Sequence, residues 1–262
     1  MPDTSSSYDV PLSVVMRLAA DAGVTMLSSG GEISRVEETI DHLARAYGVR
    51  RVDAYATPTG LLVSGESGDG STYTIGRRVP STRNDLARVV AINDLSRRAF
   101  QGRLGIEEAQ RELNKIRTAP PSYTPGMTAL AASVASAMLA MLFGGAPLDM
   151  MGAAIGGLVI QSVINEIGAR GWGAFARSWV GGFLAAAIAS VLHRILPAMS
   201  VDYAVVGAIM ILVPGVAITN SLRDVMGGQL VSGVARAAEA LTVAVGVAAG
   251  VFLGLGLGLG GF

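Results

Sequence analysis

A polar triplet follows a helix break inside an apolar run of the sequence. The break is Pro214-Gly215, and the triplet Thr219 to Ser221 begins within two helical turns of it. Proline has no backbone N–H, so a carbonyl four residues earlier in a helix loses its partner. Such carbonyls, with nearby hydroxyl and amide groups, can bind ions and polar solutes at membrane depth. The predicted substrate-binding set therefore includes Met210, Pro214, Gly215, Thr219, Asn220 and Ser221. A simple proline kink is the alternative.

A second polar group lies near the end of another apolar run. Gln161 and Asn165 are four residues apart and share one helix face, so we add both to the predicted substrate-binding set. Glu166 follows directly. An ionisable residue within a membrane segment usually faces the bundle interior or a water-filled cavity. The alternative is that Glu166 is a simple end-of-helix charge at the headgroup level.

Charged residues follow the triplet and could organise the mouth of a transport path. Arg223 and Asp224 are predicted to form an ion pair at the cytoplasmic end of this path. The complete predicted gate or ion-pair set is Glu166, Arg223, Asp224, Arg236 and Glu239.

A charged motif in the N-terminal half invites a catalytic interpretation, which the rest of the sequence does not support. No Ser/His/Asp set, phosphate-binding loop or metal-binding triad accompanies this motif, and the sequence has no Cys and only two His. A charged helix face is usually solvated. We therefore predict no enzyme activity, no metal and no cofactor. The motif residues are Glu32, Arg35, Glu37 and Glu38.

The charges divide the chain into two halves. Only five of the 20 Lys and Arg and five of the 20 Asp and Glu lie beyond Pro125, although hydrophobic residues make up 51% of the whole chain. The predicted domains are residues 1–125, a small cytoplasmic α+β domain ending in the Pro-rich linker PPSYTP, and residues 126–262, a transmembrane domain. The net charge of zero argues against nucleic-acid binding.

The C-terminal half contains five apolar runs that are long enough to cross a bilayer, which needs about 20 residues per helix. We therefore predict a membrane α-helical bundle of about five transmembrane helices. The runs are Met127 to Phe143, Met150 to Ile167, Phe175 to Leu192, Tyr203 to Leu222 and Val231 to Leu259. Small residues at four-residue spacing, as in Gly152/Gly156 and Gly246/Gly250, predict close helix packing.

Periodicity and turn residues predict the elements of the N-terminal half. Helices are expected over residues 11–29, 84–100 and 106–117, and residues 28–49 are expected to form a glycine hinge followed by a further helix that ends at Gly48. A three-stranded meander is expected over residues 51–79.

Lys and Arg in short loops predict the orientation, because cytoplasmic loops are enriched in them. The N-terminal domain is expected inside and the C-terminus outside the cytoplasmic (inner) membrane. The polar start MPDTSSSYDV does not have the pattern of a signal peptide. The glycine-rich end, Gly254 to Gly261, is expected to fray.

Three segments together resemble the threonine/serine exporter family, specifically its N-terminal-type module. They are GGEISRVEETIDHLARAYGV, YATPTGLLVS and DYAVVGAIMILVPGVAITNSLRDVMGGQLVSGVARAAEAL. The similarity runs in order from Val14 to about Val247. The resemblance implies secondary export across the cytoplasmic membrane. Because the sequence ends after five predicted spans, the resemblance also implies the larger subunit of a split exporter with a second small membrane subunit.

The expected function is a secondary-transport subunit that exports a small polar metabolite, with threonine or serine as the first substrate. A dicarboxylate such as succinate is an alternative substrate, because the resemblance also extends to split systems, some of which are linked to dicarboxylate export. A non-transporting scaffold or sensor is another, and a membrane-bound hydrolase is disfavoured by the missing catalytic set. The expected partners are the small-molecule substrate, the lipid bilayer, the second subunit and further copies of this chain as a homo-oligomer.

Overall fold

The protein folds into two compact units, and one late segment of the chain belongs to the first of them. The computed structural model describes residues 10–79 and 82–258. Unit 1 comprises the chain up to Ser122 together with Asn220–Ala235, and unit 2 comprises Tyr123–Thr219 and the chain from Arg236 onward. The segment 220–235 is therefore grouped with the N-terminal half, whereas the sequence placed the whole of 126–262 in a membrane domain.

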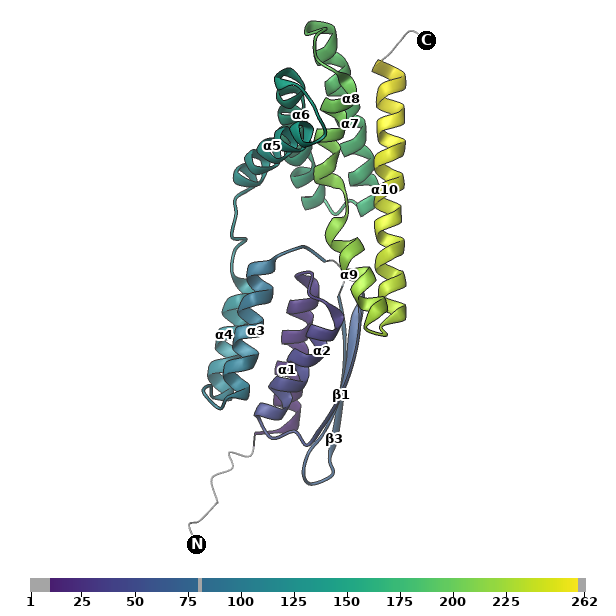
Figure 1. The fold of residues 1–262 in the computed structure, drawn as a ribbon. Helices are drawn as coiled ribbons and strands as arrows, with labels where there is room; N and C mark the ends of the chain where they lie inside the picture. The colour runs from purple at the N-terminus through teal and green to yellow at the C-terminus, as the bar shows by residue number, and fades with distance from the viewer. Residues whose placement is uncertain (1–9, 80–81, 259–262) are drawn as a thin grey trace. The chain divides into compact units, whose positions relative to one another are not determined.

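Unit 1 combines helices with an antiparallel sheet (Figure 1). The sheet order is β1-β2-β3, and the register pairs Ala56 with Leu61 and Val63 with Ile75. This confirms the predicted meander and the four predicted helices. The elements are α1 (Leu12–Ser28), α2 (Ile33–Ala46), β1 (Arg51–Thr57), β2 (Gly60–Glu66), β3 (Thr72–Arg78), α3 (Leu86–Phe100) and α4 (Ile106–Thr118).

The core of unit 1 lies between the helices and one face of the sheet. Helix α1 packs on β2 and β3, and α2 packs on β1. The periodic apolar residues Ile33, Val36, Ile40 and Leu43 of α2 are fully buried. Gly48 has a φ of 88° and follows the end of α2, as predicted for a left-handed C-terminal stop. These contacts fix the position of α2, which carries Glu37 and begins directly after Glu32.

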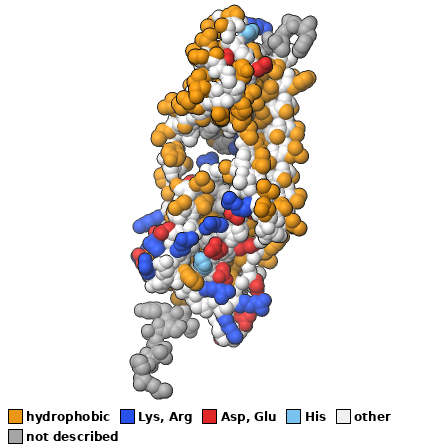
Figure 2. All heavy atoms as spheres, in the orientation of Figure 1, with side chains coloured by type: hydrophobic (Ala, Val, Ile, Leu, Met, Phe, Trp, Pro, Cys, Tyr) orange, Lys and Arg blue, Asp and Glu red, His pale blue; other side chains and the backbone are white. Residues whose placement is uncertain are grey.

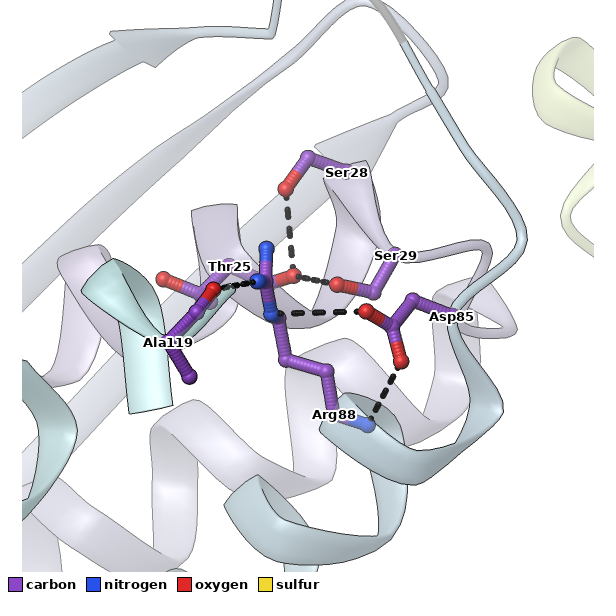
Figure 3. A network of polar contacts seen from close by, with 6 residues as sticks. All are labelled: Thr25, Ser28, Ser29, Asp85, Arg88 and Ala119. Atoms are coloured by element: carbon purple, nitrogen blue, oxygen red, sulfur yellow. Dashed lines mark hydrogen bonds and ion pairs between the residues drawn. The ribbon is translucent and has the colours of Figure 1, made fainter. Parts of the chain in front are cut away.

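A polar network joins the start of α3 to the end of α4 (Figure 3). Asp85 caps α3 by accepting the Arg88 backbone N–H at 3.1 Å, and the Arg88 guanidinium donates to the Ala119 carbonyl at 2.8 Å. Nearby, the Ser28 and Ser29 hydroxyls donate to the Thr25 carbonyl in the last turn of α1. The network thus places the chain just before the Pro-rich linker beside the first turn of α3.

Unit 2 is built from apolar helices. Of the described helices, four are long and apolar enough to cross a membrane, and α8 with α9 forms a fifth candidate that is bent by 51° at a break. This matches the five predicted runs. The elements are α5 (Pro125–Leu142), α6 (Pro147–Ala169), α7 (Ala174–Ile195), α8 (Val201–Ile209), the 3-10 turn η1 (Met210–Leu212), α9 (Gly215–Met226), which continues into unit 1, and α10 (Leu230–Gly258), which begins in unit 1.

The glycine-rich end of the chain is helical as far as the structure describes it. Helix α10 continues to Gly258, so the expected fraying is not found between Gly254 and Gly258. The rest of that prediction, including the expected end of the fifth span at Leu259, lies outside the described residues.

Small residues bring the helices of unit 2 together, as predicted. A Cβ on Gly156 would lie 2.9 Å from that of Ala208 in α8, and a Cβ on Gly246 would lie 3.0 Å from the Phe175 carbonyl in α7. Outward-facing side chains are large and apolar, for example Leu142 and Phe252, which are 76% and 81% exposed. Figure 2 shows hydrophobic side chains covering these helices. An exposed apolar surface of this kind suits a lipid environment.

A buried carboxylate ties two helix starts of unit 2. Asp149 is 3% exposed. It accepts the Ala146 N–H at 2.8 Å and the Ser200 N–H at 2.6 Å. One carboxylate therefore satisfies backbone donors at the start of α6 and at the start of α8, which holds the two helices together.

Adding one methyl group at Gly157 should loosen unit 2. An alanine Cβ there would lie 2.8 Å from the Ala132 carbonyl and would overlap the Ser136 hydroxyl in α5, so Gly157→Ala should lower stability by about 1–3 kcal/mol. Thermal unfolding in detergent measures this change. Gly126→Ala is the matched control, because a Cβ at Gly126 meets nothing within 4 Å. Equal unfolding temperatures for the two variants would contradict the packing account.

Candidate functional site

The predicted break at Pro214 is present and is larger than a kink. Helix α8 ends at Ile209, the η1 turn follows, and α9 begins at Gly215. Proline is tolerated here because the first turn of a helix leaves its N–H groups without intrahelical partners. The Pro214 carbonyl accepts the Ile218 N–H at 3.0 Å, which begins the hydrogen bonding of α9. The run is therefore two helices and not one bent helix.

One detail of the predicted break was wrong. The Met210 carbonyl is not released by Pro214, because it accepts the Val213 N–H at 3.3 Å. The chain tightens into a 3-10 turn, whose i to i+3 bonds reach a donor before the proline. The Val213 carbonyl accepts the Gly215 N–H at 2.8 Å. The backbone of the break is thus largely satisfied by local turns.

The polar triplet does not converge on one point. Thr219 is exposed and donates its hydroxyl to the Gly215 carbonyl at 2.9 Å. The Asn220 amide donates to the Gly30 carbonyl at 3.5 Å, within unit 1. Ser221 is buried and donates to the Gly233 carbonyl at 2.7 Å, which joins α9 to α10. Thr219 is the member of the triplet whose side chain is exposed.

Gln161 and Asn165 do share a helix face, as predicted, and they form a network with α5. Gln161 donates to the Asn165 amide oxygen at 2.9 Å, and Asn165 donates to the Thr128 hydroxyl at 3.1 Å and to the Pro125 carbonyl at 3.4 Å. Among the residues that the structure describes, these bonds do not reach Thr219. The network links the C-terminal part of α6 to the first turn of α5.

The predicted gate residues lie in different surroundings. Glu166 pairs with Arg170 at 2.8 Å, and both side chains are 66% exposed, which fits an end-of-helix charge. Glu239 is exposed, whereas Asp224 and Arg236 are buried.

Arg223 pairs with a residue that lies 191 positions away in sequence. Its guanidinium is 3.1 Å from the Glu32 carboxylate, where the sequence predicted a pair with the adjacent Asp224. Glu32 also accepts the Ser34 hydroxyl at 2.9 Å. Adjacent residues on a helix point in directions about 100° apart, so Arg223 and Asp224 do not face each other. The fold instead brings the loop before α2, which contains Glu32, beside α9. This pair therefore joins two parts of unit 1.

Glu37 and β1 form a second contact with the late segment. One Glu37 oxygen accepts the Ala56 N–H and the other accepts the Gln229 amide, both at 3.1 Å. The Ser232 hydroxyl donates to the Ala56 carbonyl at 3.4 Å. Because β1 is an edge strand, its outward N–H and C=O groups need partners. For Ala56, Glu37 of α2 and Ser232 of α10 supply them.

The environment of Glu37 shifts its titration. Burial raises the pKa of Glu37 above 4.5, the Ala56 N–H opposes this by bonding to the charged form, and the Asp224 carboxylate raises it further. The other two motif residues, Arg35 and Glu38, are exposed. The charged motif is therefore divided: Glu32 and Glu37 hold the segment 220–235, and Arg35 and Glu38 face outward.

Sequence reasoning missed Gln229, Ser232 and Asp149. Gln229 and Ser232 had no detectable signal, because their partners are more than 170 residues away. Asp149 could have been found, because an acidic residue in the first turn after Pro147 is typical of a helix start.

These helices and their lipid-suited surface define a multi-pass α-helical membrane protein. Residues 17–258 match the family model described as "Putative threonine/serine exporter". The chain therefore belongs to the threonine/serine exporter family.

Two curated relatives carry related names. The chain is 25% identical over 236 residues to the "Probable threonine/serine exporter" of Mycobacterium tuberculosis, which covers 90% of this chain and 44% of that protein. It is also 25% identical over 233 residues to the "Threonine/serine exporter" of Corynebacterium glutamicum, covering 87% and 48%. The chain thus spans less than half the length of these relatives. No solved structure matches it.

Neutralising Glu37 should make stability less dependent on pH. Because its pKa is raised in the folded state, Glu37 binds its proton more tightly in the folded chain than in the unfolded one. Protonated Glu37 therefore adds to the free energy of unfolding below pH 4.5, and this contribution is lost as pH rises through the folded-state pKa. Glu37→Gln keeps an oxygen for the Ala56 N–H and carries no charge. The variant should therefore unfold at a higher temperature than the wild type at about pH 7, and the two temperatures should converge toward about pH 4.

Glu38→Gln is the matched control, since Glu38 is the exposed neighbour. Thermal unfolding of the full chain in detergent at the two pH values gives the comparison. A wild type that is clearly more stable than Glu37→Gln at neutral pH would contradict the account.

Proposed function

We propose that this chain forms part of an exporter that moves threonine or serine out of the cytoplasm. The observation that carries the proposal is the broken helix formed by α8, η1 and α9, in a chain of the threonine/serine exporter family. Discontinuous membrane helices recur in secondary transporters, where helix ends and polar side chains meet the solute. The names of the two relatives support the same substrates.

The substrate site is placed at the break. Thr219 contributes an exposed hydroxyl, and the start of α9 at Gly215 points backbone N–H groups toward the break. Such a helix start favours a carboxylate, because the helix dipole is positive there. The η1 carbonyls can accept from an ammonium group, since each carbonyl has two lone pairs. An amino-acid zwitterion needs both kinds of partner. A dicarboxylate would need two cationic or N–H-rich sites, which makes it the second substrate class.

Unit 1 is placed on the cytoplasmic side. Arg170 and Arg177 lie around the connection between α6 and α7, and Arg223 and Arg236 lie on either side of the connection between α9 and α10. Arg194 lies in the last turn of α7, at the other end of that helix. The excess of cations around the α6–α7 and α9–α10 connections supports a cytoplasmic position for these two connections. With five spans, this orientation places the end of α10 outside. The segment 220–235, which follows α9's first turn along the chain, is then on the cytoplasmic side as well.

A further membrane part completes the transporter. The relatives are about twice as long as the region that matches this chain, so the counterpart of their remaining length is needed for transport. A second small subunit is the form we propose for it, and further copies of this chain could assemble around the path. The whole exporter is placed in the cytoplasmic membrane.

Reconstitution tests this function. Proteoliposomes that contain the chain together with the second membrane part should move labelled threonine or serine faster than empty vesicles do, and vesicles that contain the chain alone should not. Succinate is the parallel substrate. Faster movement of succinate with no movement of either amino acid would overturn the proposed substrate class. No movement of any of the three in either preparation would leave a scaffold or sensor and would overturn the exporter itself.

In the same vesicles, Pro214→Ala tests the broken helix. Alanine restores an N–H and favours a continuous helix, which displaces the binding groups at the break. If this displacement costs at least ~1.4 kcal/mol, transport should fall by about tenfold or more. Membrane insertion should be unchanged. Pro147→Ala is the control, because Pro147 lies in the first turn of α6 where proline breaks nothing. Normal efflux by Pro214→Ala would reduce the break to a packing feature.

A further inference from the structure

Two large apolar side chains in the first turns of α3 are exposed in unit 1. Leu86 is 64% exposed and Val90 is 66% exposed. They are four residues apart and therefore share one face of the helix. Other apolar residues of α3, for example Ile92 and Leu95, are buried in the core of the unit. The exposed pair thus forms a small apolar face that the fold of unit 1 does not use.

Exposed cations lie at the same end of unit 1 as this apolar pair. Arg83, Lys115 and Arg117 are exposed on the adjoining ends of α3 and α4. Across residues 82–90 and 113–119 the one carboxylate in the sequence is Asp85, and it pairs with Arg88 at 3.6 Å. The exposed charge of this end is therefore positive. We call Arg83, Leu86, Val90, Lys115 and Arg117 the linker-end patch.

The patch is tethered close to the start of a membrane helix. The Arg88 guanidinium holds the Ala119 carbonyl at 2.8 Å beside the first turn of α3 (Figure 3). From Ala119 the chain reaches Pro125, where α5 begins, within six residues. Six residues span at most about 20 Å. Tyr123, in the middle of this linker, is 65% exposed, and tyrosine is enriched at membrane interfaces.

We propose that the linker-end patch lies on the bilayer surface, with Leu86 and Val90 entering the interface and the three cations contacting anionic lipid headgroups. Amphipathic helix faces with basic residues bind membranes in this way, through buried apolar area and electrostatic attraction. The long stems of Lys115 and Arg117 can cover apolar surface while their charges reach the phosphates. A short tether to a membrane span favours this contact over a free partner, because it raises the local concentration of lipid. The contact does not depend on which solute is transported.

The absence of cysteine from the sequence gives a clean test. Leu86→Cys and Val90→Cys are labelled with an environment-sensitive fluorophore in the full chain. Each is placed in nanodiscs of phosphatidylcholine alone or of phosphatidylcholine with phosphatidylglycerol. Lipids carrying a spin label at headgroup depth then quench a fluorophore that lies at the surface. Gln101→Cys is the matched control, an exposed position at the other end of α3, roughly 22 Å away along a helix of 15 residues.

Both patch labels should lose emission when spin-labelled lipid is added, more strongly with phosphatidylglycerol, and the Gln101→Cys label should not. Adding Arg83→Gln, Lys115→Gln and Arg117→Gln to Leu86→Cys should remove the extra loss seen with the anionic lipid. Patch labels that are quenched no more than the Gln101→Cys label in either nanodisc would overturn the proposal.

Discussion

The missing N–H of Pro214 determines how the fourth apolar run folds. Without that donor the run loses a helical hydrogen bond, and the chain tightens into η1 before α9 begins. An interruption in lipid is stable only where other groups satisfy the backbone. Here the 3-10 turn and the first hydrogen bonds of α9 do so.

Polar contacts hold the segment 220–235 in unit 1. Glu32 pairs with Arg223, and Glu37 and Ser232 take up the outward backbone groups of Ala56. An ion pair that is partly exposed adds only about 0–1 kcal/mol to stability. The geometry matters more than the strength, because these contacts orient the second half of α9. A helix that begins at the proposed substrate site therefore ends on the N-terminal unit.

Local signals predicted most of the fold. Pro214, the spacing of apolar residues in α2, and Gly48 each act through the chain within a few residues of themselves, so the sequence predicted the break, the helix and its end. The small residues Gly156 and Gly246 also acted as predicted. The partner of Arg223 was predicted incorrectly, because Glu32 is distant in sequence and only the fold brings it near. The Met210 carbonyl was predicted to lose its partner, but a 3-10 turn supplies the Val213 N–H. Gln229 and Ser232 carry no local pattern, and only their distant partners reveal them. The substrate role of Thr219, Asn220 and Ser221 stays a prediction.

The most direct test of the account is a charge swap between Glu32 and Arg223, read as the initial rate of threonine efflux from proteoliposomes. If the ion pair orients α9 for transport, Glu32→Arg and Arg223→Glu should each slow efflux, since each places like charges together at a contact of 3.1 Å. The double variant restores an opposite-charge pair and should recover most of the wild-type rate. A double variant that is as slow as the product of the two single effects would contradict the account, as would single variants with the wild-type rate.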